Sequence, residues 1–210
     1  MWENYCAYYS INVKNMTKEK SPAGIILFLF IGLLLILLSP EDKESGMLLK
    51  LVFLHSALIT AGLSLFTAGG IVGLISLLRK VSGFTLLFAI EKTAIIFWVA
   101  ASIIGGIISL LAWGEVFLDM PRLIAAVIVS LLSAGIYFIS TASKNPRIIS
   151  FLVIGLALSV WTLIMNTGKI IHPDNPFGAS GPAIKFYFII ITLAFLMLSI
   201  QVVRWMKKQK

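Results

Sequence analysis

The chain has 210 residues, of which 59% are hydrophobic and only 12% are charged, and its mean hydropathy is +1.00. A soluble domain carries about a quarter charged residues, so this composition all but excludes a soluble enzyme. The apolar residues fall in runs of about 20, the length of a helix that crosses a hydrocarbon core of ~30 Å. The runs are continuous rather than alternating, which excludes a porin-like barrel. The net charge of +8 is, in a membrane chain, more typical of basic cytoplasmic loops than of nucleic-acid binding.

The first 22 residues are polar and aromatic and lack the basic start, short apolar core and cleavage site of a signal peptide. We expect residues 1–22 to form a retained cytoplasmic tail, residues 23–206 a transmembrane domain, and residues 207–210 a basic cytoplasmic tail. The single cysteine, Cys6, excludes an internal disulfide and a metal site made of cysteines alone.

Charged residues, prolines and polar turns divide the rest of the chain into six apolar runs. An even number of crossings leaves both termini on one side of the membrane. Lys and Arg are concentrated on that side, so the positive-inside rule predicts an all-α polytopic protein with six transmembrane helices and both termini in the cytoplasm. The runs are Ala23–Ser39, Met47–Leu78, Gly83–Ala112, Leu123–Ser140, Ile148–Met165 and Ala183–Val203.

Two of the runs are longer than one crossing requires. As a helix at 1.5 Å per residue, Met47–Leu78 would be about 48 Å long, so counting back from its inner end puts the outer boundary near Ile59. In the third run we expect Glu91 and Lys92 near the inner interface, with the crossing at Thr93–Ala112. The alternative is that the two charges enter the bundle as a buried pair, which would indicate a functional site.

Small residues mark the interior of the same two runs. The second run contains Gly69-x-x-x-Gly73 and the third contains Gly105-Gly106. Small residues allow transmembrane helices to approach closely. We expect these glycines to serve helix packing rather than a ligand site.

The chain has two histidines, His55 and His172, and the expected topology brings both to the outer face. His55 then lies about one turn above the hydrocarbon, at the start of the second crossing, and His172 lies just after the fifth run. Two imidazoles from different helices at one depth can be the axial ligands of a haem. Between them, the loop 113–123 can stack an aromatic side chain on the macrocycle, and Arg122 can pair with a propionate.

Other interpretations of these residues stay open. His55 can be a polar residue at a helix start, and His172 a loop residue before Pro173. Trp113 can be an interfacial anchor, the usual role of Trp at the end of a membrane helix. Two histidines with nearby acids can also bind zinc or copper, although no short ligand spacing such as His-x-x-x-His supports this.

The loop after the third run combines Trp113-Gly114 with Arg122-Leu123, and Pro121 precedes the arginine. This spacing resembles the tryptophan-rich WWD signature of the CcmC/CcsA family of haem-handling proteins for cytochrome c maturation. Phe117 and Asp119 stand where the signature has tryptophans, and Met120 takes the place of its aspartate. The segments around His55 and His172 look like the regions of the family's two external histidines.

The resemblance implies a CcmC-type membrane protein that binds haem at the outer face and delivers it to a carrier. It implies His55 and His172 as the axial ligands of a non-covalently bound, b-type haem, with the loop as its platform. The haem-contacting residues that it implies besides the histidines are Trp113, Gly114, Phe117, Asp119, Pro121 and Arg122.

The resemblance also implies partners and a location. The partners are an external haem carrier, ATP-binding transporter subunits and a small membrane subunit, and the location is the plasma membrane with the site facing outside. We expect no nucleic-acid partner and no catalytic side chain, so the chain would be a haem-transfer factor rather than an enzyme. Two rivals remain: a cytochrome b-type membrane anchor of a respiratory complex, and a cofactor-free permease or scaffold subunit with incidental histidines.

Overall fold

The computed structural model describes residues 22–41, 46–79, 84–116, 120–143, 145–167 and 181–208. Within these ranges the chain forms six α-helices and no β-strand, which confirms the all-α prediction. The helices are α2 (Ala23–Leu38), α3 (Leu48–Arg79), α4 (Phe84–Trp113), α5 (Pro121–Ala142), α6 (Pro146–Asn166) and α8 (Pro182–Lys207).

Among the described helices, α3, α4, α5, α6 and α8 are long and apolar enough to cross a membrane. Helix α2 is also apolar but has only 16 residues, or about 24 Å at 1.5 Å per residue. The two long apolar runs are each one continuous helix, with 32 residues in α3 and 30 in α4. By the length and composition of its helices, the chain is a multi-pass membrane protein.

Prolines set where three helices begin. Pro121, Pro146 and Pro182 are the first residues of α5, α6 and α8, where proline's missing N–H costs nothing because the first turn has no acceptor for it. The start of α6 is also capped, since the side-chain oxygen of Asn145 accepts a hydrogen bond from the backbone N–H of Arg147 (3.0 Å). The breaks between apolar runs in the sequence therefore coincide with real helix ends.

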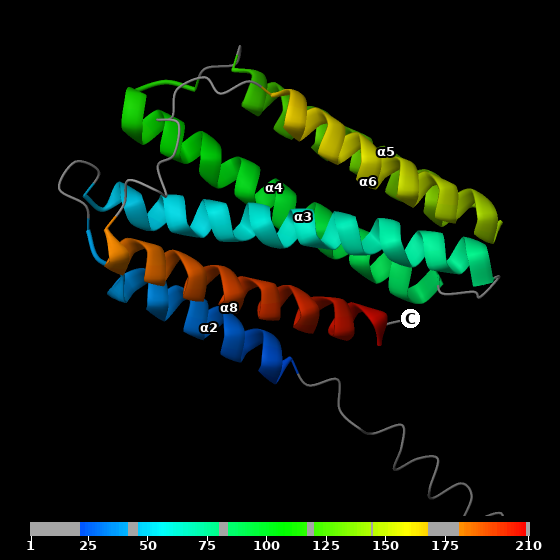
Figure 1. Cartoon of the computed structure of the whole chain (residues 1–210), viewed down its shortest axis with the longest axis horizontal. Helices are drawn as coiled ribbons and strands as arrows, with labels where there is room; N and C mark the ends of the chain where they lie inside the picture. Colours follow the sequence, from blue (N-terminus) through cyan, green and yellow to red (C-terminus); the bar gives the residue numbers. More distant parts are fainter. Residues whose placement is uncertain are drawn as a thin grey trace, which may run out of the picture.

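The six helices pack in three layers of two (Figure 1). The middle layer is α3 with α4, which share the most extensive contact in the described chain. Helices α5 and α6 cover one side of this layer, and α2 and α8 lie together on the other. Each middle helix therefore has neighbours on both sides.

Glycines in α3 allow α6 to approach it closely. A Cβ at Gly70 would lie 2.7 Å from the Cβ of Ala157, and one at Gly73 would lie 3.3 Å from the carbonyl oxygen of Ser150. A Cβ at Gly69 would lie 3.3 Å from Val153. The packing role predicted for the second-run glycines is therefore confirmed, and their partner is α6.

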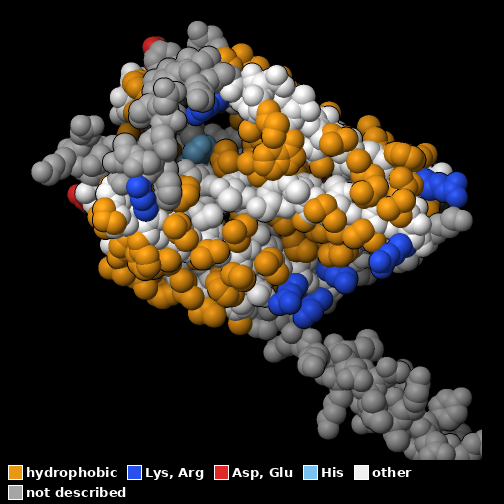
Figure 2. Space-filling view, in the orientation of Figure 1, with side chains coloured by type: hydrophobic (Ala, Val, Ile, Leu, Met, Phe, Trp, Pro, Cys, Tyr) orange, Lys and Arg blue, Asp and Glu red, His pale blue; other side chains and the backbone are white. Residues whose placement is uncertain are grey.

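The outer surface of the bundle is apolar. Figure 2 shows hydrophobic side chains spread over the sides of the helices, with Lys and Arg gathered toward the ends. Leu37, Leu131 and Phe138 are each more than two-thirds exposed. A soluble monomer rarely exposes a continuous apolar surface of this extent, whereas lipid covers it.

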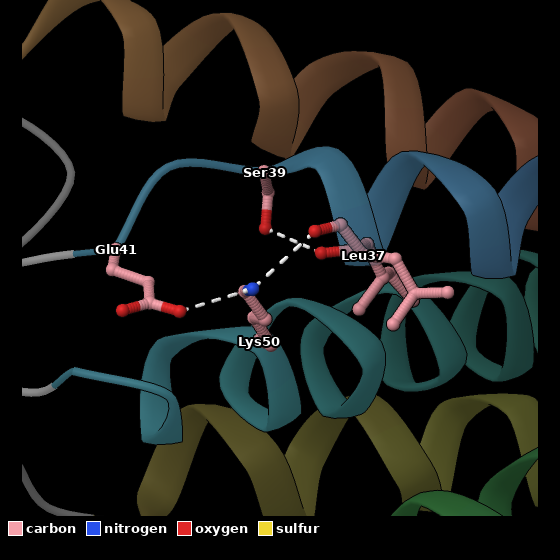
Figure 3. A network of polar contacts seen from close by, with 5 residues as sticks. Leu37, Ser39, Glu41 and Lys50 are labelled. Atoms are coloured by element: carbon pink, nitrogen blue, oxygen red, sulfur yellow. Dashed lines mark hydrogen bonds and ion pairs between the residues drawn. The ribbon is translucent and has the colours of Figure 1, made fainter.

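A small polar network joins α2 to α3 where the chain turns between them (Figure 3). The ammonium group of Lys50 forms an ion pair with Glu41 (3.2 Å) and donates a hydrogen bond to the carbonyl oxygen of Leu37 (3.3 Å). The hydroxyl of Ser39 donates to the carbonyl oxygen of Ile36 (2.7 Å). These contacts satisfy carbonyl groups that the end of α2 leaves without helical partners.

Candidate functional site

His55 lies on α3 where this helix faces α4. Its Nδ1 is 2.8 Å from the carbonyl oxygen of Ala101 on α4. A carbonyl oxygen can only accept a hydrogen bond, so Nδ1 carries the proton and donates it. In the neutral ring, Nε2 then holds the lone pair. Imidazoles that bind metals are commonly oriented in this way, with one nitrogen donating to a backbone carbonyl and the other coordinating.

Gly105 makes room for this hydrogen bond. In an α-helix, the carbonyl of residue 101 points toward residue 105, one turn later. A Cβ at Gly105 would lie 2.8 Å from Cε1 of His55, closer than non-bonded atoms allow, and 3.2 Å from Nδ1. The prediction that Gly105 serves packing is confirmed, but its partner is an imidazole ring. A Cβ on the neighbouring Gly106 would meet no described atom within 4 Å.

His55 and Trp113, both expected at the outer face, lie at different levels along α4. Ala101 and Gly105 lie about 18 Å and 12 Å before Trp113 along α4, so the imidazole is more than two turns away from the loop that follows that helix. The first turns of α3 do not project beyond α4: Phe53 is 2% exposed and belongs to the core cluster shared with α4 and α8. The expected level came from hydrocarbon thickness alone, which does not include how the two helices cross.

The residues of the WWD-like loop that the structure describes lie at helix ends. Trp113 is the last residue of α4 and is 44% exposed. Gly114 has φ +80°, a left-handed conformation that ends helices and that glycine adopts without steric cost. Its N–H donates to the carbonyl oxygen of Leu110 (2.9 Å), and the Ser109 hydroxyl donates to that of Glu115 (2.9 Å). The Trp-Gly pair therefore has a structural role in ending α4.

On the other side of the loop, Pro121 is the first residue of α5 and Arg122 is exposed beside it. The end of α4 and the start of α5 lie at the same end of the bundle (Figure 1). The structure therefore brings Trp113, Gly114, Pro121 and Arg122 to one end, while His55 lies deeper. The other predicted haem-site residues, Phe117, Asp119 and His172, lie outside the described residues.

The described residues contain no metal site made of protein side chains alone. There, no three His, Cys, Asp or Glu residues lie close enough to hold one ion together. The zinc or copper interpretation therefore gains no support from these residues. His55 remains the one described imidazole, with its ring already oriented.

Glu91 is a further functional candidate, whose burial the sequence interpretation left open. Its side chain is only 2% exposed, and neither carboxylate oxygen has a hydrogen-bond partner among the described residues. Because Lys92 is exposed, the alternative of a buried pair is wrong, while the level of the two residues relative to the membrane interface stays a prediction. Adjacent residues on a helix point about 100° apart, so one faces the bundle while the other faces its surroundings.

Comparisons with protein-family models and with curated proteins found no match to the chain.

Proposed function

We propose that this chain is a membrane haem-binding and haem-delivery protein of cytochrome c maturation. One observation carries the proposal: the His55 imidazole is oriented by the carbonyl of Ala101 in the manner of a metal ligand, in a notch that exists because residue 105 is glycine. The resemblance of the loop 113–123 to the WWD signature supports the same function. Haem is the cargo in this proposal, so no side chain needs to make or break a covalent bond.

The roles of the residues follow from their chemistry. His55 and His172 supply the two axial nitrogens, and the aromatic face of Trp113 supports the macrocycle. Arg122, exposed at the start of α5, binds a haem propionate through its fork of N–H donors. Gly114, Phe117, Asp119 and Pro121 shape the loop. Delivery then requires an external haem carrier, and by the same resemblance ATP-binding transporter subunits and a small membrane subunit.

The proposed topology has six crossings, with α2 as the shortest, and both termini in the cytoplasm. Lys and Arg predominate at the end of the bundle where α3 and α8 end, as the positive-inside rule requires for the cytoplasmic side. A reporter that is active only outside the cytoplasm should work when it is fused after Glu44 or Pro176 and fail after Lys210. The opposite pattern would turn the WWD-like loop toward the cytoplasm and end the proposal of external delivery.

Haem binding is tested on the full chain purified from haem-sufficient cells into lipid nanodiscs. The wild type should carry haem with the absorption spectrum of a low-spin, bis-histidine iron. His55→Gly and His172→Gly should each shift the spectrum toward high spin or lose haem, and added imidazole should partly restore the low-spin form. Wild-type protein without haem, or two single variants with unchanged spectra, would refute the bis-histidine site.

The loop has a matched control in the chain. Arg122 and Arg147 both follow a proline at the first position of a helix, and both are exposed, but they lie at opposite ends of the bundle. Arg122→Lys keeps the charge and loses the bidentate fork, so it should lower haem occupancy, whereas Arg147→Lys should leave it unchanged. Equal occupancy in both variants would remove Arg122 from the site.

The depth of His55 favours a second candidate, a cytochrome b-type membrane anchor. Such subunits hold haem within the hydrocarbon to move electrons across it, and His55 lies more than two turns from the nearer end of α4. A redox titration separates the two functions. Reversible one-electron reduction by quinol, with haem retained throughout, supports the anchor, whereas haem released to an apo-carrier protein supports delivery.

A further inference from the structure

Glu91 is a buried carboxyl group inside a membrane bundle. On α4 it shares one stripe with Leu87, Ala94 and Trp98. Leu87 packs in a cluster with α6, while Ala94 and Trp98 pack in a cluster that includes residues of α3, α5 and α6. Glu91 therefore points into the part of the bundle that these four helices enclose, away from lipid.

Two contacts set the register of α4 against α5 at this level. The indole N–H of Trp98 donates to the carbonyl oxygen of Ala126 (3.1 Å), and the rings of Phe88 and Tyr137 lie 6.3 Å apart. The helices are antiparallel, so Glu91, which lies between Phe88 and Trp98 on α4, is level with residues near 133 on α5. Ser133 is there, with 0% exposure.

A second unusual polar group lies on the same stripe of α5. Ser140 is fully buried, and its hydroxyl has no hydrogen-bond partner among the described residues. Several hydroxyls among the described helices bond to the carbonyl one turn earlier, as those of Ser130 and Thr93 do. Ser140 lies two turns beyond Ser133, toward the end of the bundle where α4 begins.

We infer that Glu91 is a proton-binding site inside the bundle, which exchanges its proton with solution along the buried side of α5 that carries Ser133 and Ser140. Glu91 is about 10 Å from the start of α4 and about 33 Å from its end. Exchange therefore takes place at the end of the bundle where α3 ends and α4 begins. An ionised carboxylate enclosed without a partner is far more costly than a neutral carboxyl, which favours a bound proton. Ionisable residues at such positions in membrane proteins commonly belong to proton relays.

The described surroundings favour a proton over a metal ion. Sodium or a divalent cation needs several oxygen ligands, whereas a single carboxyl can hold a proton. The basic residues on the described helices toward the end of the bundle where α4 begins are exposed, and Tyr137 is the half-buried titratable group on α5. Those basic residues are Arg79 on α3, Lys92 on α4, Arg147 on α6, and Arg204 and Lys207 on α8. Toward the other end lie Lys50 and His55 on α3, Arg122 on α5 and Lys185 on α8.

An apolar carbodiimide tests the site in the full chain in lipid nanodiscs. Dicyclohexylcarbodiimide adds to a protonated carboxyl and rearranges to a stable N-acylurea that contains the whole reagent, so mass spectrometry of peptides locates it. Glu91 should be labelled, with a rate at least about tenfold higher near pH 5 than near pH 9, because only the protonated form reacts. The exposed Glu115 should instead react with a water-soluble carbodiimide.

Three results would overturn the inference: no labelling of Glu91 at any pH, the same rate at every pH, or protection by sodium at constant ionic strength. The labelling needs no variant, so it does not depend on whether a variant folds. Glu91→Gln should abolish the adduct and the infrared carbonyl band of a protonated carboxyl.

A matched pair of serine variants tests the exchange route. Ser140→Ala should slow deuterium exchange of the Glu91 carboxyl several-fold. Ser199→Ala removes another buried serine, which bonds to the carbonyl of Leu196 on α8, and should leave exchange unchanged. Equal exchange in both variants would overturn the route. The haem test and this test share no residue, so each proposal can fail alone.

Discussion

His55 and Glu91 are both polar side chains on the middle layer of an apolar bundle, yet their surroundings differ. His55 has a carbonyl partner at 2.8 Å and a glycine that accommodates its ring. Glu91 is more deeply buried and has no hydrogen-bond partner among the described residues. A satisfied polar group orients a side chain and contributes to stability, whereas an unsatisfied buried one is retained at a cost in stability. The arrangement at His55 suits a metal such as haem iron, which needs a nitrogen in a fixed position. The arrangement at Glu91 suits a proton, which neutralises the carboxylate.

The largest effect is expected from filling the notch beside His55. Gly105→Ala brings a Cβ to 2.8 Å from the imidazole, so the ring must move and lose its bond to Ala101. We expect a loss of about 1–3 kcal/mol in the free energy of unfolding, as for other overpacked sites. Reversible unfolding in mixed micelles measures it.

The adjacent Gly106 is the control for that variant. A Cβ there would meet no described atom within 4 Å, and alanine is a better helix former than glycine. Gly106→Ala should therefore leave stability unchanged or raise it by a few tenths of a kcal/mol. If the two variants behave alike, His55 does not depend on the glycine notch.

Removing the two polar groups should have unequal effects on stability. His55→Ala loses a hydrogen bond between helices, worth about 0.6–1.7 kcal/mol in membrane proteins, together with the contacts of the ring. Glu91→Gln replaces the carboxyl with a neutral group of the same shape, so we expect a change below about 0.5 kcal/mol in either direction. Thermal unfolding of both variants in the same nanodiscs gives the comparison. A larger loss for Glu91→Gln would mean that the carboxylate is ionised and paired.

The lengths of the apolar runs and the positions of prolines and charges were sufficient to predict most of the fold. The six apolar runs coincide with six described helices because prolines and charges interrupt them at residues such as Pro121 and Pro146. The small spacing of Gly69 and Gly73 also predicted close packing, because it depends only on side-chain size. The membrane crossing of the short α2 and the sides of the termini remain predictions.

The site was less predictable because it depends on pairs of helices. Sequence distance to a membrane boundary says nothing about which residue of α4 lies opposite His55, so the separation of the imidazole from Trp113 was not predicted. The burial of Glu91 without Lys92 follows from the rotation of α4 in the bundle. An acid next to a lysine within an otherwise apolar run was the available signal, and the sequence left open whether the two are interfacial or buried.

A further comparison concerns the end of α4, where the backbone conformation rather than a side-chain contact requires glycine. Gly114→Ala places a Cβ at φ +80°, which costs about 1 kcal/mol for a residue other than glycine. We expect that loss in stability and, in the proposed haem protein, lower haem occupancy, because Trp113 then loses its fixed position. Gly135→Ala on α5, where a Cβ would meet no described atom within 4 Å, is the control. An unchanged Gly114→Ala would show that the helix end adapts.

The smallest effect is expected at the water-accessible end of the bundle, where Lys50 contacts both Glu41 and the carbonyl of Leu37. Glu41 is 55% exposed and Lys50 is 19% exposed, so water replaces much of any contact that is lost. Glu41→Gln should cost about 0–0.5 kcal/mol, and added salt should erase the difference, because screening weakens exposed ion pairs. Lys50→Gln should cost slightly more, up to about 1 kcal/mol, and part of that should persist in salt, since the ammonium also satisfies the end of α2. Thermal unfolding at low and high ionic strength separates the two parts. The stability lost in Glu41→Gln could instead be as large as that in His55→Ala and insensitive to salt. That result would mean that solvent does not weaken the Lys50–Glu41 ion pair relative to the buried groups.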